Sequence, residues 1–168
     1  MSSSADPLLL KKNIDPIRDR ILFRKETIAI AESVTSGLLQ LAFSMATDAE
    51  KFYQGGITTY NIGQKVRHLR IEPIHAMEYN CVSLKVSAEM AVQVGNLFNS
   101  DWGIGITGYA SPVPESGNKL FAYFAIAYNG KIVVAKSIKP KKANPFSVQL
   151  FYSKEVLKEL YMNLNTFE

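Results

Sequence analysis

The sequence predicts an α/β fold, a three-layer α/β/α sandwich with a mixed central sheet. Short apolar, β-rich runs alternate along the chain with longer segments whose apolar residues recur every three or four positions. The dipeptide Asn129-Gly130 stands between two of the short runs and is typical of a hairpin, so part of the sheet is antiparallel. The 168 residues, of which 47% are hydrophobic and 20% charged, suit one globular domain with its own core. Helices are therefore expected on both faces of one sheet.

The first half of the chain alternates between expected helices and strands. Residues 1–13 are interpreted as an N-terminal arm and residues 14–168 as the domain. The expected elements are, in order, a helix from Pro16 to about residue 25, a strand at 27–32, a helix at 37–46, a loop or short helix at 47–54, a strand at 56–60 and a helix at 64–69. Pro16 suits the first turn of a helix because the N–H that proline lacks has no helical partner there.

The second half contains a long amphipathic helix and a predicted hairpin. The expected elements are a helix at 83–99 with Ser83 as its N-cap, a strand at 102–107, a loop at 109–118, strands at 120–128 and 131–138, and a closing helix at 153–163. Two prolines and a glycine favour the loop at 109–118. The apolar stripe of each helix is expected to face the sheet.

Composition and charge argue against several classes of function. The formal net charge is +4, and the densest positive run, residues 136–142, suits a solvated strand end better than a nucleic-acid groove. The single cysteine, Cys81, cannot form an internal disulfide and fits a reducing, cytoplasmic location. His68 and His75 lack partners at metal-ligand spacing, so no metal site is expected. The N-terminus does not resemble a signal peptide, and no apolar run is long enough to cross a membrane.

Polar side chains follow three of the expected strands. Ser33, Thr35 and Ser36 come after the first strand, Tyr60 and Lys65 after the second, and Thr107 with Gly108 after the third. Ligands of open α/β sheets bind beyond the carboxyl ends of parallel strands, so these residues can converge on one crevice. A hydroxyl there can attack a carbonyl. A lysine in a partly dry cleft can have its pKa lowered enough to accept the hydroxyl proton, and Tyr60 can relay that proton or orient the base.

Each of these residues also has a purely structural interpretation. Ser33 or Thr35 can cap the following helix, and Lys65 can be a solvated helix lysine. Tyr60 and Thr107 can be ordinary strand residues. Glu32 can orient the site or anchor a neighbouring backbone N–H. Periodicity alone does not separate these alternatives.

Four segments resemble the CinA C-terminal domain family, the nicotinamide mononucleotide amidases, over about residues 18–163. The segment "AESVTSGLL" is similar to the family pattern Ala-Glu-Ser-Cys-Thr-Gly-Gly-Leu-Leu. The other three are "GGITTYNIGQKVRHL", "VSLKVSAEMA" and "DWGIGITGYASP", in the family's order and with compatible gaps. Any one of them is a weak signal, whereas four in order are specific.

The resemblance implies an activity and a set of roles. It implies hydrolysis of the carboxamide of nicotinamide mononucleotide, or of a related amide, with release of ammonia and without a metal or cofactor. Ser33 is then the nucleophile, Lys65 the general base and Tyr60 a supporting proton relay. The expected substrate-binding residues are Glu32, Thr35, Ser36, Gly37, Thr107 and Gly108. The turn after residue 32 is expected to present Ser33 beside the positive N-terminus of the next helix. A cytoplasmic homodimer with a small-molecule amide substrate, and no nucleic-acid or membrane partner, is the expected setting.

The chain departs from the family pattern around the expected anion site. The family's glycine-rich Ala-Gly-Pro-Gly-Gly loop is replaced here by residues 110–117, "ASPVPESG", which lose backbone freedom and gain Glu115. Leu150 stands where the family pattern has an arginine. Three hypotheses follow: an amidase on nicotinamide mononucleotide, a catalytically silent ligand-binding or interaction domain, and an amidase whose substrate lacks the phosphate.

Overall fold

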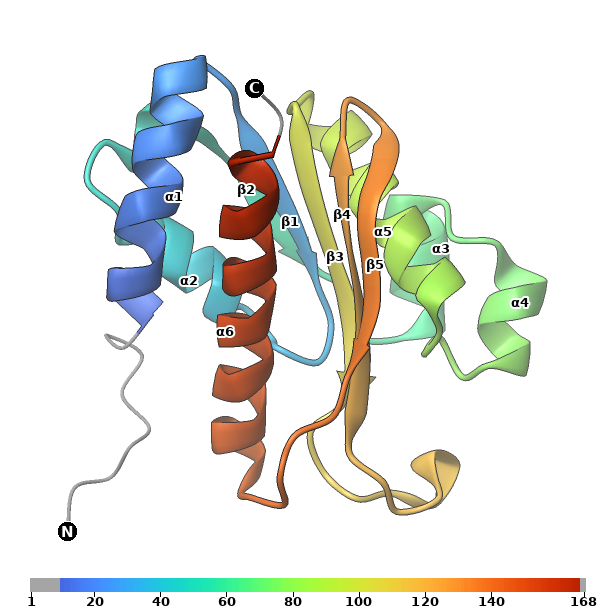
Figure 1. Cartoon of the computed structure of the whole chain (residues 1–168). Coiled ribbons are helices and arrows are strands. Elements are labelled where there is room, and N and C mark those ends of the chain that lie inside the picture. Colours follow the sequence, from blue (N-terminus) through green and yellow to red (C-terminus); the bar gives the residue numbers. More distant parts are fainter. Residues whose placement is uncertain (1–9, 167–168) are drawn as a thin grey trace, which may run out of the picture.

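A computed structural model describes residues 10–166 and contains one mixed sheet between two layers of helices (Figure 1). The elements are α1 (Lys11–Arg24), β1 (Ile28–Glu32), α2 (Leu38–Ser44), the 3₁₀ turn η2 (Ala49–Lys51), β2 (Tyr53–Thr58), α3 (Ile62–Leu69), α4 (Pro73–Glu78), α5 (Leu84–Phe98), β3 (Trp102–Tyr109), the 3₁₀ turn η3 (Pro114–Ser116), β4 (Phe121–Tyr128), β5 (Lys131–Ile138) and α6 (Pro145–Leu164). Helices α1, α2 and α6 cover one face of the sheet, and α3, α4 and α5 lie on the other. The three-layer prediction is confirmed.

The strand order brings the expected functional segments to one end of the sheet. The order is β2-β1-β3-β4-β5; β2, β1 and β3 are parallel, and β4 and β5 are antiparallel to their neighbours. Glu32 at the end of β1 pairs with Thr58 at the end of β2, and Ala31 pairs with Gly105 of β3. The segments that follow these strands therefore leave the sheet side by side. Such a position is the usual place for a ligand in this type of sheet.

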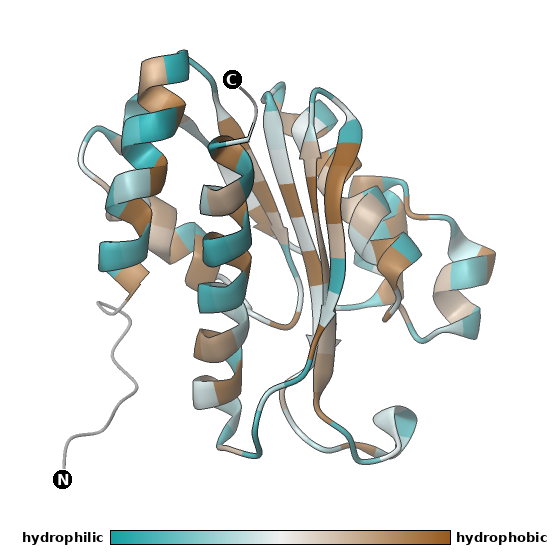
Figure 2. Cartoon of the chain, viewed as in Figure 1, coloured by the Kyte–Doolittle hydropathy of each residue, from teal (hydrophilic) through white to brown (hydrophobic). Residues whose placement is uncertain are grey.

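The core is divided by the sheet into two apolar layers. The larger layer joins the sheet to α1, α2 and α6, and the smaller one joins it to α3, α4 and α5. All five residues of β1 are buried, as expected for a central parallel strand. In Figure 2, hydrophobic residues (brown) mark the strands and alternate with hydrophilic ones (teal) along α1 and α6. This alternation is the helical periodicity that the sequence displays.

Close contact between α5 and β3 depends on two glycines. A Cβ atom on Gly103 would lie 2.0 Å from Ala91 O, and one on Gly105 would lie 2.3 Å from Ser87 O. These separations are far below van der Waals contact, so any side chain at either position would push the helix away from the sheet. The glycines therefore fix how closely the α5 layer approaches the strand that ends at the site.

The first helix begins earlier than predicted. Residues 1–13 were expected to form an arm and Pro16 to lie in the first helical turn, but α1 begins at Lys11 and Pro16 lies inside it. Residues 1–9 of the expected arm lie outside the described residues. Leu10, Ile14 and Ile17 are fully buried at helical spacing. Their packing outweighs the single backbone hydrogen bond that an internal proline removes.

The last helix also begins earlier than predicted, at Pro145 and not near residue 153. The side chain of Asn144 accepts a hydrogen bond from Ser147 N, and Pro145 occupies the first helical position. An asparagine N-cap followed by proline is a start signal that was overlooked in the sequence.

The helix α4 was not predicted from the sequence either. Glu72 caps it by accepting hydrogen bonds from Ile74 N and His75 N.

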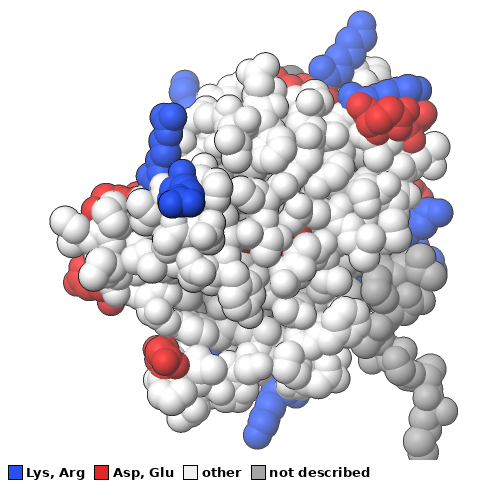
Figure 3. Space-filling model, turned by 180° about the vertical axis from the view of Figure 1, so that it is seen from behind, with Lys and Arg blue, Asp and Glu red and all other residues white. Residues whose placement is uncertain are grey.

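Charged side chains are unevenly distributed over the surface. Seen from behind, lysines, arginines and carboxylates gather at the margins of the molecule, and the broad middle of this face is largely uncharged (Figure 3).

None of the helices in the described part of the chain is both long and apolar enough to span a membrane. Within residues 10–166, no three His, Cys, Asp or Glu side chains are grouped as metal ligands would be.

Candidate active site

A buried carboxylate shapes the turn that presents Ser33. Glu32 is fully buried at the end of β1 and accepts hydrogen bonds from Gly37 N (3.1 Å), Leu39 N (3.2 Å) and Gln40 N (2.7 Å). Ser36 (φ +49°) and Gly37 (φ +99°) adopt left-handed backbone conformations, which tighten the turn. Ser33 thus sits on a rigid corner between β1 and α2, with 7% of its surface exposed.

The hydrogen bonds of Glu32 distinguish between the two roles that the sequence left open for it, substrate binding and anchoring of a neighbouring backbone N–H. The Glu32 carboxylate points into the start of α2, as the anchoring alternative predicts, and Glu32 does not line the cavity, so the structure gives no support to its predicted substrate-binding role. The N-terminus of α2 is consequently neutralised by Glu32 and does not offer its N–H groups to the site. Thr35, Ser36 and Gly37 likewise shape the turn and do not line the cavity beside Ser33. The Thr35 hydroxyl is buried without a hydrogen-bond partner in the described structure.

We expect Glu32→Gln to destabilise the fold. The glutamine amide places an NH₂ group where a carboxylate oxygen now accepts backbone N–H bonds, so buried donors face each other. The expected loss is about 2 kcal/mol in the free energy of unfolding. Urea denaturation followed by circular dichroism measures it, with the exposed Glu50→Gln as the matched control. A loss no greater than that of the control would contradict the anchoring role.

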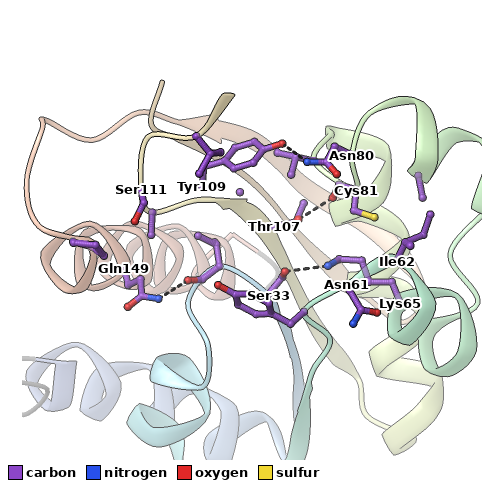
Figure 4. Close-up of a pocket in the computed structure, with 18 of the residues that line it drawn as sticks. Ser33, Asn61, Ile62, Lys65, Asn80, Cys81, Thr107, Tyr109, Ser111 and Gln149 are labelled. Atoms are coloured by element: carbon purple, nitrogen blue, oxygen red, sulfur yellow. Dashed lines mark hydrogen bonds between the residues drawn. The ribbon is translucent and has the colours of Figure 1, made fainter. Parts of the chain in front are cut away.

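Lys65 reaches Ser33 from the other side of the cavity. It lies on α3, whose first turn is capped by Asn61 through a hydrogen bond from Gln64 N. The Lys65 side chain is only 2% exposed, so the interpretation as a solvated lysine is wrong. Its Nζ atom lies 3.0 Å from Ser33 Oγ (Figure 4). The same atom donates to Thr59 O at 2.8 Å. The structure therefore brings the predicted nucleophile and base into hydrogen-bond contact.

The surroundings of Lys65 favour its neutral form. Burial lowers the pKa of the Lys65 ammonium below its ordinary value of 10.5. Cys81 lies on the same cavity wall, and burial raises the pKa of its thiol, which keeps that wall uncharged. A lysine whose pKa is lowered by burial, next to a serine hydroxyl, is an arrangement that suits base catalysis.

The end of β3 forms the third wall. Thr107 is buried, and its hydroxyl donates to Cys81 O at 2.8 Å, so it ties the segment between α4 and α5 to β3. Gly108 follows and lies against β4, where a Cβ atom would be 2.5 Å from the Ala122 side chain. Thr107 and Gly108 both line the cavity, as predicted. The Thr107 hydroxyl, however, is engaged by the protein.

These walls enclose a cavity of about 660 Å³. A volume of this size accommodates a small-molecule ligand. Tyr60 also lines the cavity; its side chain is 71% exposed and makes no hydrogen bond to any described residue. Its ring forms part of the mouth, and its role as a proton relay stays a prediction.

Several residues that line the cavity were not predicted from the sequence. They are Asn61, Asn80, Cys81, Tyr109, Ser111 and Gln149. Asn80 Nδ2 donates to Tyr109 Oη at 2.9 Å, and Gln149 Nε2 donates to Val34 O at 2.9 Å, so both amides brace the walls (Figure 4). The Asn144-Pro145 start signal would have placed Gln149 in the second turn of α6. Asn80 follows a helix that showed no clear periodicity, and no signal in the sequence pointed to it.

Leu150 lies in the core and not in the cavity. It is 4% exposed and packs in the larger apolar layer. Successive residues of a helix point about 100° apart, so its neighbour Gln149 is the one that reaches the cavity. The position at which the family pattern has an arginine is therefore a core position in this chain, and it does not line the cavity.

Comparison with known proteins identifies the family. The model of the CinA C-terminal domain matches residues 11–163. The chain belongs to the CinA C-terminal domain family. A CinA-like protein of Picosynechococcus is 34% identical over 112 residues, which make up 67% of this chain and 27% of that protein. A CinA-like protein of Prochlorococcus marinus is 38% identical over 96 residues, 57% of this chain and 23% of that protein. The matched region is thus about a quarter of the length of these curated relatives.

Solved structures with the same fold support this assignment. A CinA superfamily protein from Klebsiella pneumoniae superposes with a TM-score of 0.89 at 22% identity and covers 94% of this chain and 99% of that one. A CinA superfamily protein from Escherichia coli gives a TM-score of 0.83 at 26% identity, over 95% of this chain and 91% of that one. The CinA architecture therefore extends over nearly the whole described chain.

Proposed function

We propose that this CinA-type domain is a serine amidase that hydrolyses the carboxamide of nicotinamide mononucleotide or of a related amide. The observation that carries the proposal is the 3.0 Å contact between Lys65 Nζ and Ser33 Oγ inside a ligand-sized cavity. A lysine whose pKa is lowered by burial can act as the base in place of histidine. The fold alone does not establish this activity, since one fold serves many functions.

In the first half of the proposed reaction, Ser33 Oγ attacks the amide carbonyl while neutral Lys65 takes the hydroxyl proton. Thr59 O holds one N–H of the amine, which fixes the direction of the Nζ lone pair. The Val34 backbone N–H, adjacent to the nucleophile, has no acceptor within the described residues and can donate to the oxyanion. Lys65 then returns the proton to the amide nitrogen, the C–N bond breaks, and ammonia leaves an acyl-serine.

In the second half, water attacks the acyl-serine. Lys65 takes a proton from the water, and the resulting tetrahedral species collapses to a carboxylic acid and free Ser33, which regains its proton from Lys65. The net reaction converts an amide and water into a carboxylic acid and ammonia. The carboxylic acid then ionises to the carboxylate. All proton transfers pass through the one amine, so the reaction needs no other titratable group of the chain.

Ammonia release from the purified protein tests the proposal. Nicotinamide mononucleotide and nicotinamide riboside are each incubated with enzyme, and ammonia is measured by a coupled assay. Release that depends on enzyme concentration and yields the matching carboxylate supports the amidase. Absence of release from both amides would favour a catalytically silent domain, in which the Ser33–Lys65 contact is structural only.

The rate should rise with pH and then level off. Only neutral Lys65 can accept the Ser33 proton, and the neutral fraction grows as the pH approaches and passes its pKa, which burial places below 10.5. Over the range from about pH 6 to about pH 10 we therefore expect kcat/KM for the amide to increase with pH and to reach its plateau at a lower pH than a lysine of ordinary pKa would give. Stopped assays across this range, with protein stability checked at each pH, measure the profile. A rate that is flat or falls over this range would exclude a lysine base.

A further inference from the structure

The charge of the cavity lining bears on which amide this site accepts, an inference that rests on the proposed function. Among the lining residues, all within the described part of the chain, Lys65 is the one cationic side chain, and no arginine or carboxylate joins it. Its Nζ atom is already held by Ser33 and by Thr59 O. A phosphate group brought into this cavity would give up its hydration without meeting a cation free to pair with it.

Three amide side chains, Asn61, Asn80 and Gln149, lie on the cavity walls and offer uncharged polar groups to a ligand. Gln149 donates one N–H to Val34 O and Asn80 donates one N–H to Tyr109 Oη, so each NH₂ group keeps a second N–H. Asn61 accepts from Gln64 N through its oxygen and keeps its NH₂ group. The carbonyl oxygens of Asn80 and Gln149 remain available. Tyr109, which accepts from Asn80, keeps its own hydroxyl proton for a ligand. These neutral donors and acceptors pair with the hydroxyl groups of a sugar, and none of them carries the positive charge that would offset the desolvation of a phosphate, so the walls match a sugar better than a phosphorylated sugar.

The loop beyond Tyr109 has prolines at positions 112 and 114, which interrupt its run of backbone N–H groups. Pro112 lacks an N–H group, and Ser111 and Val113 on either side of it line the cavity. The N–H of Asn118 and that of Gly117 are used within the same loop, on Val113 O and Pro114 O. A loop built in this way cannot wrap a phosphate with successive N–H groups, which is the usual backbone solution for that ligand.

Two aromatic rings on the walls suit a flat cation. Tyr60 lines the mouth without a hydrogen bond to any described residue, and Tyr109 packs edge-on against Phe121 with ring centroids 5.3 Å apart. Tyrosine faces attract cations through the ring quadrupole. A pyridinium ring that bears a carboxamide is such a cation, and it stays positively charged when the phosphate is absent.

We propose that the cavity selects an unphosphorylated pyridinium carboxamide with a hydroxyl-bearing, uncharged N-substituent over its phosphorylated counterpart. The substituent lies against the Asn80 and Gln149 oxygens, and the ring lies near Tyr60. The amide carbonyl is directed at Ser33.

Ligand binding tests this selectivity separately from catalysis. Nicotinamide riboside and nicotinamide mononucleotide are titrated by calorimetry into the Ser33→Ala variant, which cannot turn them over. We expect the riboside to bind at least about tenfold more tightly. Equal or tighter binding of the mononucleotide, or no binding of either, would overturn the inference. Tight riboside binding without ammonia release by the unmodified protein would leave the inference standing and remove the amidase.

Two pairs of variants locate the cause of the selectivity. Ser111→Arg places a cation on the cavity wall and should raise the affinity for the mononucleotide relative to the riboside by about tenfold. Ser137→Arg adds the same charge on an exposed position of β5 and should leave the ratio unchanged. Tyr60→Leu should weaken riboside binding about fivefold while Tyr60→Phe retains it, because only the ring is required. Equal effects of Ser111→Arg and Ser137→Arg would contradict selection by the cavity wall.

Discussion

Replacing Ser33 by alanine is expected to lower kcat/KM for the carboxamide substrate at least about a thousandfold. In the proposed reaction the substitution removes the atom that forms the acyl intermediate, and the described residues of the cavity wall include no second hydroxyl in contact with Lys65. Cys81 also lines the cavity, but no hydrogen bond joins its thiol to Lys65 among the described residues, whereas Ser33 Oγ is in contact with Lys65 Nζ. Ammonia release and carboxylate formation, measured under identical conditions for both proteins, give the ratio.

The control for this experiment is another buried serine. Ser87 is fully buried on α5, and its hydroxyl donates to Leu84 O within the same helix. Ser87→Ala should therefore retain activity within about twofold, since alanine is a strong helix former. Both variants should fold, as shown by their circular dichroism and melting temperatures. Ammonia release by Ser33→Ala at the rate of the unmodified protein would exclude Ser33 as the nucleophile.

Replacing Lys65 by methionine is expected to abolish the activity while the protein remains folded. Methionine has nearly the shape of lysine and lacks the amine, so Ser33 loses its base and kcat/KM should fall at least about a thousandfold. Removal of a buried amine also removes its desolvation cost, and this gain offsets the hydrogen bond lost by Thr59 O. The free energy of unfolding should change by less than about 2 kcal/mol.

This pair of measurements separates catalysis from structure. If Lys65 serves only to hold α3 against the Ser33 turn, Lys65→Met should reduce stability by more than about 3 kcal/mol, the cost of breaking a needed buried contact. Lys85→Met, on the exposed side of α5, is the matched control and should change neither quantity. Intact activity in a stable Lys65→Met protein would contradict the proposed dyad.

Much of the architecture follows from local patterns in the sequence. The buried run of β1, the Asn129-Gly130 turn and the stripe on α5 each predict their element, because period and turn chemistry depend on neighbouring residues alone. The starts of α1 and α6 were placed too late for different reasons. At Pro16, tertiary packing overrides the local preference of proline, whereas at Asn144 a local cap signal was present and was missed.

The residues of the site that follow the ends of neighbouring strands could be predicted from the sequence, because those strand ends lie side by side at one edge of the sheet. Ser33, Tyr60, Lys65, Thr107 and Gly108 all line the same cavity. Glu32, in contrast, was assigned to the substrate although its carboxylate binds the start of α2. The two roles need the same residue at the same place in the chain, and only the direction of its side chain distinguishes them. Asn80 and Gln149 are distant from the other site residues in sequence, so no spacing rule connects them.

The amino-acid sequence by itself determined the alternation of strands and helices, the parallel order that sends Ser33 and Lys65 to one end of the sheet, and the family resemblance. The tertiary structure decided that Lys65 is buried against Ser33, that Glu32 faces the helix and that the cavity walls are neutral. The period of apolar residues in a helix or strand predicts which of its faces packs against the core. Burial, hydrogen-bond direction and local charge arise only when separate elements pack together, and these three properties set the pKa of Lys65 and the charge of the cavity walls.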